Sequence, residues 1–271
     1  MTPFLSCVHT HTHFCDGKDS PQTMVDKALE LGFVSLGFSS HSPVQWDEWA
    51  MKPESVPAYR AEILELQQVY ADRLEILLGL EHDSLGDYPT EPYDYLIESV
   101  HAMEVDGQLC YLDWSPDRMQ EAINTLFGGD PYAYAKAYFQ VCANTYASSP
   151  AQIAGHIDLL TKFNEQYPCF DETDPRYLHP ALEAVDCALE RGMVLEVNTG
   201  AISRGYRTTP YPGDAILRHI LQRGATVIVT SDCHDANYLS CHYEQVAEKL
   251  KALGFRSTLR LRKSGFEEIG L

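Results

Sequence analysis

The sequence predicts an α/β protein whose parallel sheet forms a TIM-like (β/α) barrel. Apolar segments typical of strands alternate with helical segments, and this alternation predicts parallel strands joined by helical crossovers. Some strand candidates, such as 226–230, are almost continuously apolar, which indicates a strand covered on both faces. A length of 271 residues suits a barrel. An open doubly wound sheet fits the same pattern, but no GxGxxG or P-loop motif supports a nucleotide-binding one.

Seven strands and a shorter C-terminal segment are expected. The strands cover 4–11, 33–40, 74–81, 95–101, 152–156, 193–198 and 226–232, and the shorter segment covers 255–261. Three helical patterns lie between them, at 21–31, 180–191 and 212–223. Each starts at a proline and is followed directly by a glycine, which is the asymmetry that helix ends favour. The tyrosine-rich segment 106–149 is expected to hold two helices that cover the mouth or side of the core.

Composition and charge narrow the class of protein. Apolar residues make up 45% of the chain and charged residues 22%, which are ordinary values for a globular protein. No run approaches the roughly 18 apolar residues that span a bilayer, and the start of the chain lacks a signal-peptide pattern. A net charge of −19 disfavours nucleic acids and membranes as partners. We expect a cytoplasmic monomer or homodimer with reduced cysteines, although Cys15 and Cys233 beside the polar motifs could be oxidation-sensitive.

Side chains that bind metals follow nearly every predicted strand. His9 and His11 end the first strand at a spacing of two, so both imidazoles point the same way. Asp232 and His234 repeat this spacing after the last strand, and other strands end near His41, Glu81, His101, His156 and Glu196. The carboxyl ends of the strands of a parallel barrel share one face. Burying so many ionisable groups without a cation would be costly, which predicts a multinuclear metal site.

These motifs resemble those of the PHP (polymerase and histidinol phosphatase) superfamily. They are His9-Thr10-His11 with Asp16-Gly17, Ser40-His41-Ser42-Pro43, Gly79-Leu80-Glu81, Ser99-Val100-His101, Gly155-His156-Ile157-Asp158 and Ser231-Asp232-Cys233-His234. Their order and spacing match the superfamily from residue 8 to residue 235, and 155–163 with 197–204 resemble its histidinol-phosphate phosphatases. The resemblance implies one distorted (β/α)7 barrel domain over 1–271, with a helical insertion around 106–149 and a metal site at the C-terminal face of the strands.

The resemblance also implies three metal ions and a ligand set for each. The sets are His9, His11, Glu81 and Asp232; Glu81, His101 and His156; and Asp16, His41 and His234. Glu81 would bridge the first two ions. His13 lies in the same loop as Asp16 and is an alternative ligand of the third ion. Imidazole and carboxylate ligands suit zinc, iron and manganese alike.

Paired ions of this kind suit the hydrolysis of phosphate monoesters. They clamp phosphate oxygens and activate a bridging hydroxide for in-line attack on phosphorus. The leaving alkoxide needs a proton, which Asp16, His41, His234 or a metal-bound water could supply. Lys162 and Arg204 lie in loops after the fifth and sixth predicted strands and would complete the phosphate site.

The resemblance therefore implies a phosphomonoesterase that converts L-histidinol phosphate to L-histidinol and phosphate in histidine biosynthesis. The alternative substrate is another small phosphomonoester or a nucleotide. An acidic and aromatic wall would suit the cationic end of histidinol phosphate. Glu196, Asp158, Trp114 and several tyrosines are candidates for that wall, and a structural role is equally open for Glu196.

Overall fold

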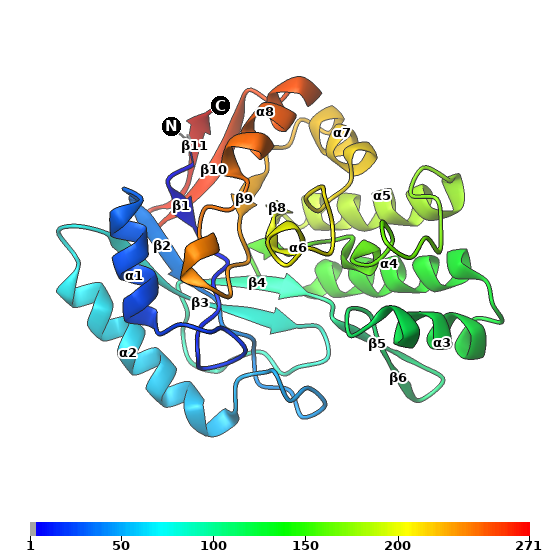
Figure 1. Ribbon diagram of the computed structural model, residues 1–271, viewed down its shortest axis with the longest axis horizontal. Coiled ribbons are helices and arrows are strands. Elements are labelled where there is room, and N and C mark those ends of the chain that lie inside the picture. The colour runs from blue at the N-terminus through cyan, green and yellow to red at the C-terminus, as the bar shows by residue number, and fades with distance from the viewer. Residues whose placement is uncertain (1–3) are drawn as a thin grey trace.

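The computed structural model describes residues 4–271 and confirms the predicted parallel sheet. The strands of the main sheet lie in the order β1-β2-β3-β4-β7-β8-β9-β10-β11, and each neighbouring pair is parallel except β10 with β11 (Figure 1). Their bounds are β1 Ser6–Cys7, β2 Ser35–Phe38, β3 Glu75–Asp83, β4 Tyr95–Ser99, β7 Ile153–Ala154, β8 Val194–Asn198, β9 Ile228–Thr230, β10 Ser257–Arg262 and β11 Gly265–Gly270. The seven predicted strands and the C-terminal segment are thus all present, and the antiparallel β11 is an addition.

Helices connect the strands. They are α1 (Pro21–Glu30), α2 (Val56–Val69), α3 (Pro116–Leu126), α4 (Pro131–Ser148), α5 (Pro175–Glu190), the short α6 (Gly200–Ser203), α7 (Asp214–Gln222) and α8 (Tyr243–Leu253), with single 3-10 turns at Pro53–Ser55, Leu159–Thr161 and Ala236–Tyr238. In Figure 1, α1 and α2 lie at the left of the molecule and α3, α4 and α5 at the right. Two predicted helix starts need correction. The helix after β7 starts at Pro175, where Asp174 accepts a hydrogen bond from the Arg176 N–H, so the predicted start at Pro180 lies inside it. The helix before β9 starts at Asp214 rather than at residue 212.

The segment 106–149 holds the two expected helices, α3 and α4, and α4 packs along α5. A two-stranded hairpin of β5 (Ala102–Val105) and β6 (Gln108–Tyr111) precedes them and was not predicted. Its turn residues are Asp106 and Gly107, both with positive φ, which is the backbone of a tight hairpin turn. The hairpin and the two helices lie together at one side of the molecule in Figure 1.

The two faces of the sheet are packed differently. One face contributes strand residues to a large core that includes side chains of the helices. The other face forms a separate cluster whose buried members come from the strands or the residues beside them: Val8, Leu77, Tyr95, Ile97, Ile153, Val194, Ile228 and Leu261. Tyr95 crosses this second face and donates a hydrogen bond of 2.5 Å to the carbonyl of Val8. This face therefore packs against itself rather than against helices.

The first and the seventh parallel strands also meet. Beyond the ends of β1 and β9, Thr10 and Cys233 form a parallel bridge. The His11 N–H donates to the Cys233 carbonyl at 2.8 Å, and the Cys233 N–H donates to the His9 carbonyl at 3.0 Å. The bridge brings the histidines that follow β1 next to the polar residues that follow β9. Among residues 4–271, no helix has the length and apolar character that crossing a bilayer requires.

Candidate metal centre

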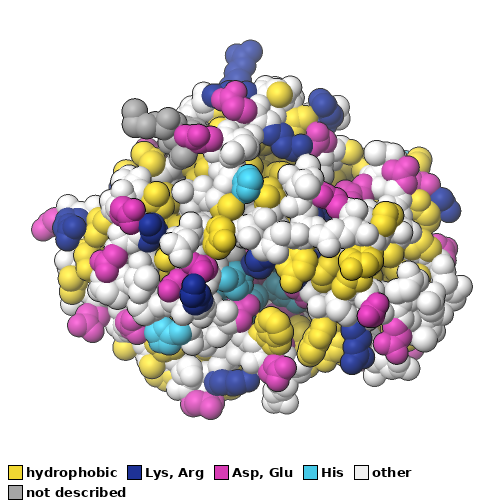
Figure 2. Space-filling view, in the orientation of Figure 1, with side chains coloured by type: hydrophobic (Ala, Val, Ile, Leu, Met, Phe, Trp, Pro, Cys, Tyr) yellow, Lys and Arg dark blue, Asp and Glu magenta, His cyan; other side chains and the backbone are white. Residues whose placement is uncertain are grey.

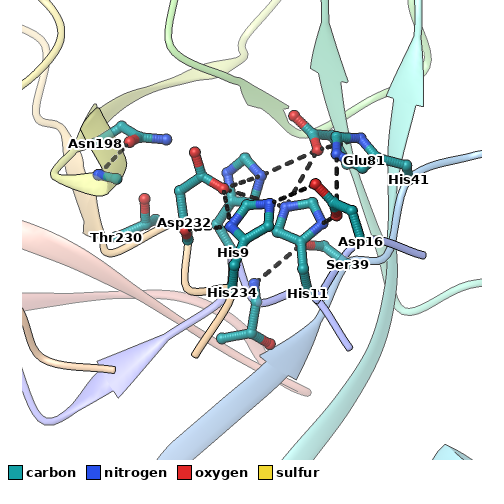
Figure 3. A network of polar contacts seen from close by, with 12 residues as sticks. His9, His11, Asp16, Ser39, His41, Glu81, Asn198, Thr230, Asp232 and His234 are labelled. Carbon is teal, nitrogen blue, oxygen red and sulfur yellow. Dashed lines mark hydrogen bonds and ion pairs between the residues drawn. The ribbon is translucent and has the colours of Figure 1, made fainter. Parts of the chain in front are cut away.

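The side chains of His9 and His11 lie side by side beneath a cavity, as their spacing predicts. Both are fully buried, and their ring centroids are 5.2 Å apart. Thr10 between them points elsewhere and donates to the Gly37 carbonyl at 2.6 Å. The Thr10–Cys233 bridge then sets Asp232 beside both rings, with its Oδ1 3.1 Å from His11 Nε2 and 3.6 Å from His9 Nε2 (Figure 3).

The carboxylate of Glu81 lies at the centre of the cluster, at the end of β3. Its Oε2 faces three imidazoles, at 2.9 Å from His41, 3.2 Å from His9 and 3.4 Å from His11. Its Oε1 faces two others, at 3.0 Å from His156 and 3.5 Å from His101. The two oxygens of one buried carboxylate thus face two different groups of histidines.

Asp16 is the second carboxylate that several histidines of the cluster contact. Its carboxylate lies 3.1 Å from His234, 3.5 Å from His11 and 3.6 Å from His41. The following Gly17 allows the loop to fold this tightly, since a Cβ there would lie 2.4 Å from the backbone of residues 11 and 12. The alternative His13 is exposed and stacks on Phe14, so the structure brings Asp16 and not His13 to the cluster.

Further carboxylates fix the orientation of two imidazoles from behind. Glu196 is fully buried, and its Oε1 lies 2.6 Å from His9 Nδ1 while its Oε2 accepts the backbone N–H of His156 at 2.7 Å. Asp83 is placed in the same way, with its Oδ2 3.1 Å from His101 Nδ1. A carboxylate on the rear nitrogen fixes the ring and leaves Nε2 free to bind a metal.

The cluster attracts positive charge. Burial alone would raise the pKa of Glu81, but the imidazoles of His9, His41 and His101 hold it well below its usual value. The carboxylates of Glu196, Glu81 and Asp232 outweigh burial and raise the pKa of His9. Burial, together with His234 and His41, lowers the pKa of His11 to about 3, so this ring stays neutral. The ionised carboxylates and the neutral His11 ring are in the protonation states that metal binding requires, whereas a bound cation would have to displace the proton that His9 retains.

The cluster also contains buried polar atoms without hydrogen bonds. They are Nε2 of His9, Nε2 of His11, Oδ1 of Asp16, Oε2 of Glu81 and Nδ1 of His156. Buried polar atoms are nearly always satisfied, so five in one place call for a cation. Four overlapping groups of side chains have ligand atoms within 4.8 Å of one another: His11, Asp16, His41 and His234; His9, His156 and Asp232; His9, His11 and Glu81; and His41, Glu81 and His101. Nitrogen and carboxylate donors in this number fit transition metal ions.

A cavity of about 320 Å³ opens above the cluster. Asp16, His41, Glu81, His101, His156, Asp232 and His234 line its floor, and Lys162 and Arg204 line its wall. The Lys162 ammonium donates to the carbonyl and the carboxylate of Asp113 at 2.9 and 3.1 Å. The Arg204 guanidinium donates to Asp232 Oδ2 at 2.9 Å and contacts His234 Nδ1 at 2.8 Å. Figure 2 shows histidines at the bottom of a hollow near the centre of this face, beside basic and acidic side chains.

Comparison with known proteins agrees with this geometry. Residues 8–200 match the PHP domain family model. The chain belongs to the PHP family. It is 30% identical to "Probable histidinol-phosphatase" of Deinococcus radiodurans, over 94% of this chain and 96% of that protein, and 28% identical to "Histidinol-phosphatase" of Bacillus subtilis, over 89% and 97%. A solved structure of histidinol phosphate phosphatase from Lactococcus lactis, in complex with zinc, L-histidinol and phosphate, is similar in fold with a TM-score of 0.72 at 20% identity, covering 97% of this chain and 98% of that one.

Some cavity residues of this PHP protein were not predicted from its sequence. Asp113, Asp47, Trp46, Trp49 and Tyr206 line the cavity but belong to loops without a strand-end signal. Asp83, which contacts His101 from behind, could have been predicted from the sequence. It lies two residues after Glu81 on the same strand, so the two side chains point the same way.

The candidates for the substrate wall separate into two groups. Trp114 lines the cavity, whereas Glu196 and Asp158 are fully buried and do not. Glu196 instead orients the ring of His9 through the contact with Nδ1. Asp158 accepts the Gly213 N–H at 2.8 Å, and burial raises its pKa to about 7.

Proposed function

We propose that this chain is a metal-dependent phosphomonoesterase that hydrolyses L-histidinol phosphate to L-histidinol and phosphate, a step of histidine biosynthesis. The observation that carries the proposal is the position of Glu81, between two groups of imidazoles, on the floor of a cavity with Lys162 and Arg204 in its wall. The full-length relatives named histidinol-phosphatase support the substrate. The related structure that holds zinc, L-histidinol and phosphate supports it as well.

The proposed scaffold is a distorted (β/α)7 barrel that forms one domain over 1–271, with the segment around 106–149 as an insertion. The Thr10–Cys233 bridge and the helix-free cluster on one face of the sheet support closure. The ligand side chains lie after their strands in sequence or, for Glu81, near the C-terminal end of β3, which supports a site at the C-terminal face. Residues 1–3 of this domain lie outside the described part of the chain. Cytoplasmic location and a monomeric or homodimeric state complete the proposal.

We assign three metal ions to this site. His9, His11, Glu81 and Asp232 would hold the first, Glu81, His101 and His156 the second, and Asp16, His41 and His234 the third. The contacts of Glu81 and Asp16 and the five buried atoms without hydrogen bonds support these sets. When bound, zinc, iron or manganese polarises the phosphate oxygens and lowers the pKa of a coordinated water.

The other residues bind and orient the ester. The guanidinium of Arg204 presents paired N–H donors to phosphate oxygens, and the ammonium of Lys162 adds a point charge. Both cations are already partnered by Asp232 and Asp113, so they stay in the wall and need little reorganisation when phosphate arrives. Asp16, His41 and His234 line the same cavity, so one of them, or a water positioned beside them, would supply the proton that the leaving alkoxide takes.

Phosphate release from L-histidinol phosphate, with Mn²⁺, Zn²⁺ or Fe²⁺ added, tests the proposal. A panel of other phosphomonoesters and nucleotides is assayed beside it. We expect L-histidinol phosphate to have the highest kcat/KM and Glu81→Gln to abolish turnover of every substrate. Equal rates for wild type and Glu81→Gln would refute the metal-dependent reaction. A higher kcat/KM for another ester would refute the substrate alone.

A further inference from the structure

Among the described residues 4–271, one carboxylate in the cavity has no basic partner. The other acidic side chains of the lining each face a histidine, lysine or arginine: Asp16 faces His234 at 3.1 Å, Glu81 faces His41 at 2.9 Å, Asp113 faces Lys162 at 3.1 Å and Asp232 faces Arg204 at 2.9 Å. Asp47 lines the same cavity, and within residues 4–271 it has no ion pair. Its Oδ1 accepts only the backbone N–H of Trp49, at 2.9 Å, which fixes the carboxylate in the loop between β2 and α2.

Exposed aromatic rings stand next to this carboxylate. Trp49 and Trp114 are 54% and 48% exposed although both line the cavity. They come from loops about 65 residues apart, and their ring centroids are 6.4 Å apart. Tyr111 meets Trp114 edge-on at 5.0 Å. Large aromatic side chains left open in a cavity are typical of ligand contacts, and Figure 2 shows hydrophobic side chains beside the hollow.

The two ends of the proposed substrate have opposite charges. Its phosphate is drawn to the metal ions, Lys162 and Arg204, whereas the amino alcohol carries an ammonium and an imidazole. A carboxylate without a cation partner suits an ammonium, and indole faces suit both a flat ring and a cation. The net charge of −19 further favours a cationic group over a neutral one near this rim.

We propose that Asp47 binds the ammonium group of the substrate, while Trp49 and Trp114 contact its imidazole ring. This inference rests on the proposed function and deepens it. Asp47 and the two tryptophans distinguish L-histidinol phosphate from other phosphomonoesters, and the metal centre treats the phosphate of every ester alike. Discrimination therefore depends on two loops outside the sheet.

Two substrate analogues separate these contacts. The first lacks only the ammonium and is 3-(imidazol-4-yl)propyl phosphate; the second, 2-aminopropyl phosphate, keeps the ammonium and lacks the ring. For wild type, we expect kcat/KM to fall about 10- to 100-fold on loss of the ammonium, as expected for a hydrogen bond to a charged group. In Asp47→Asn, the ratio between L-histidinol phosphate and the first analogue should approach one.

Three variants complete the design. Glu48→Gln removes a charge from the same loop at an exposed residue outside the cavity lining, and it should keep the wild-type ratio. Asp47→Glu restores the charge and should recover part of the ratio. Trp114→Leu should reduce the preference for L-histidinol phosphate over the second analogue and leave the ammonium ratio in place.

The outcomes are distinct. An Asp47→Asn enzyme with the wild-type ratio, or a wild type that hydrolyses L-histidinol phosphate and the first analogue equally well, overturns the ammonium site while the proposed function stands. An unchanged preference in Trp114→Leu overturns the ring contact. A wild type that hydrolyses neither L-histidinol phosphate nor the first analogue refutes the proposed function, and this inference with it.

Discussion

The carboxylate of Glu196 fixes the ring of His9, with its Oε1 2.6 Å from Nδ1 and both side chains fully buried. The same carboxylate accepts the backbone N–H of His156 at 2.7 Å and the hydroxyl of Thr230 at 2.6 Å. One residue thereby joins the histidines that follow β1 and β7. Nε2 of His9 is left facing Glu81 and Asp232, without a hydrogen bond.

Replacing Glu196 should therefore weaken metal binding without removing a ligand. We expect Glu196→Gln to lower metal affinity and kcat/KM by about 10- to 100-fold, as is usual when a carboxylate behind a ligating histidine is lost. Metal content after dialysis, measured by mass spectrometry, and steady-state kinetics check this. Glu190→Gln, at the exposed end of α5, is the control. A variant with full metal content and full activity would show that Glu196 does not orient His9.

Arg204 should act through the geometry of its guanidinium. Arg204→Lys keeps the charge but loses the paired donors, so we expect kcat/KM for L-histidinol phosphate to fall about 10- to 100-fold. Arg204 also binds Asp232, so metal content must be measured in the same preparation. Arg218→Lys, at an exposed position of α7, should have no effect. Unchanged kinetics in Arg204→Lys would remove this residue from the phosphate site.

Metal removal should lower stability as well as activity. The buried atoms of His9, His11, Asp16, Glu81 and His156 that lack hydrogen bonds would bind cations in the folded state, so binding favours that state. We expect a chelator to lower the Tm by about 3 °C or more, since 1 kcal/mol corresponds to about 2–4 °C in a domain of this size. Adding Mn²⁺ or Zn²⁺ after removal of the chelator should restore the Tm in thermal denaturation. A Tm insensitive to chelation would contradict a buried metal centre.

Gly79 should be required for packing beneath the site. A Cβ at this position of β3 would lie 2.2 Å from Cζ of Tyr95, whose hydroxyl binds the Val8 carbonyl just before His9. We expect Gly79→Ala to lower the free energy of unfolding by about 1–3 kcal/mol, the usual cost of overpacking a core. Gly270→Ala is the control, because a Cβ there would contact nothing. Equal urea denaturation curves for the two variants would show that Tyr95 can move away.

The parts of the fold and site that could be predicted are those set by strand periodicity. The spacing of His9 and His11 places both rings on one side, and the same spacing brings Asp232 and His234 into the cluster. The start of a helix depends on its N-cap residue as well as on proline. Asp174 caps α5, so the helix starts at Pro175 and Pro180 lies inside it. The sequence signal of the β5–β6 hairpin is Asp106–Gly107, a pair typical of tight hairpin turns, flanked by short strand-like segments.

The wall of the cavity could not be predicted for a physical reason. Asp113 reaches Lys162 from the loop after the hairpin, and Trp49 meets Trp114 from a separate loop. These contacts join segments far apart in the sequence, and their placement depends on how the hairpin and helices pack. No periodic pattern marks such residues, in contrast to the ligands that follow the strands.

Glu81 is expected to bridge metal ions that bind phosphate. Anomalous scattering at the zinc, iron and manganese edges, from a crystal grown with phosphate, tests it most directly. We expect three ions, two of them sharing the carboxylate of Glu81, with phosphate bound between the ions, Lys162 and Arg204. A single ion, or ions that do not contact Glu81, would contradict it.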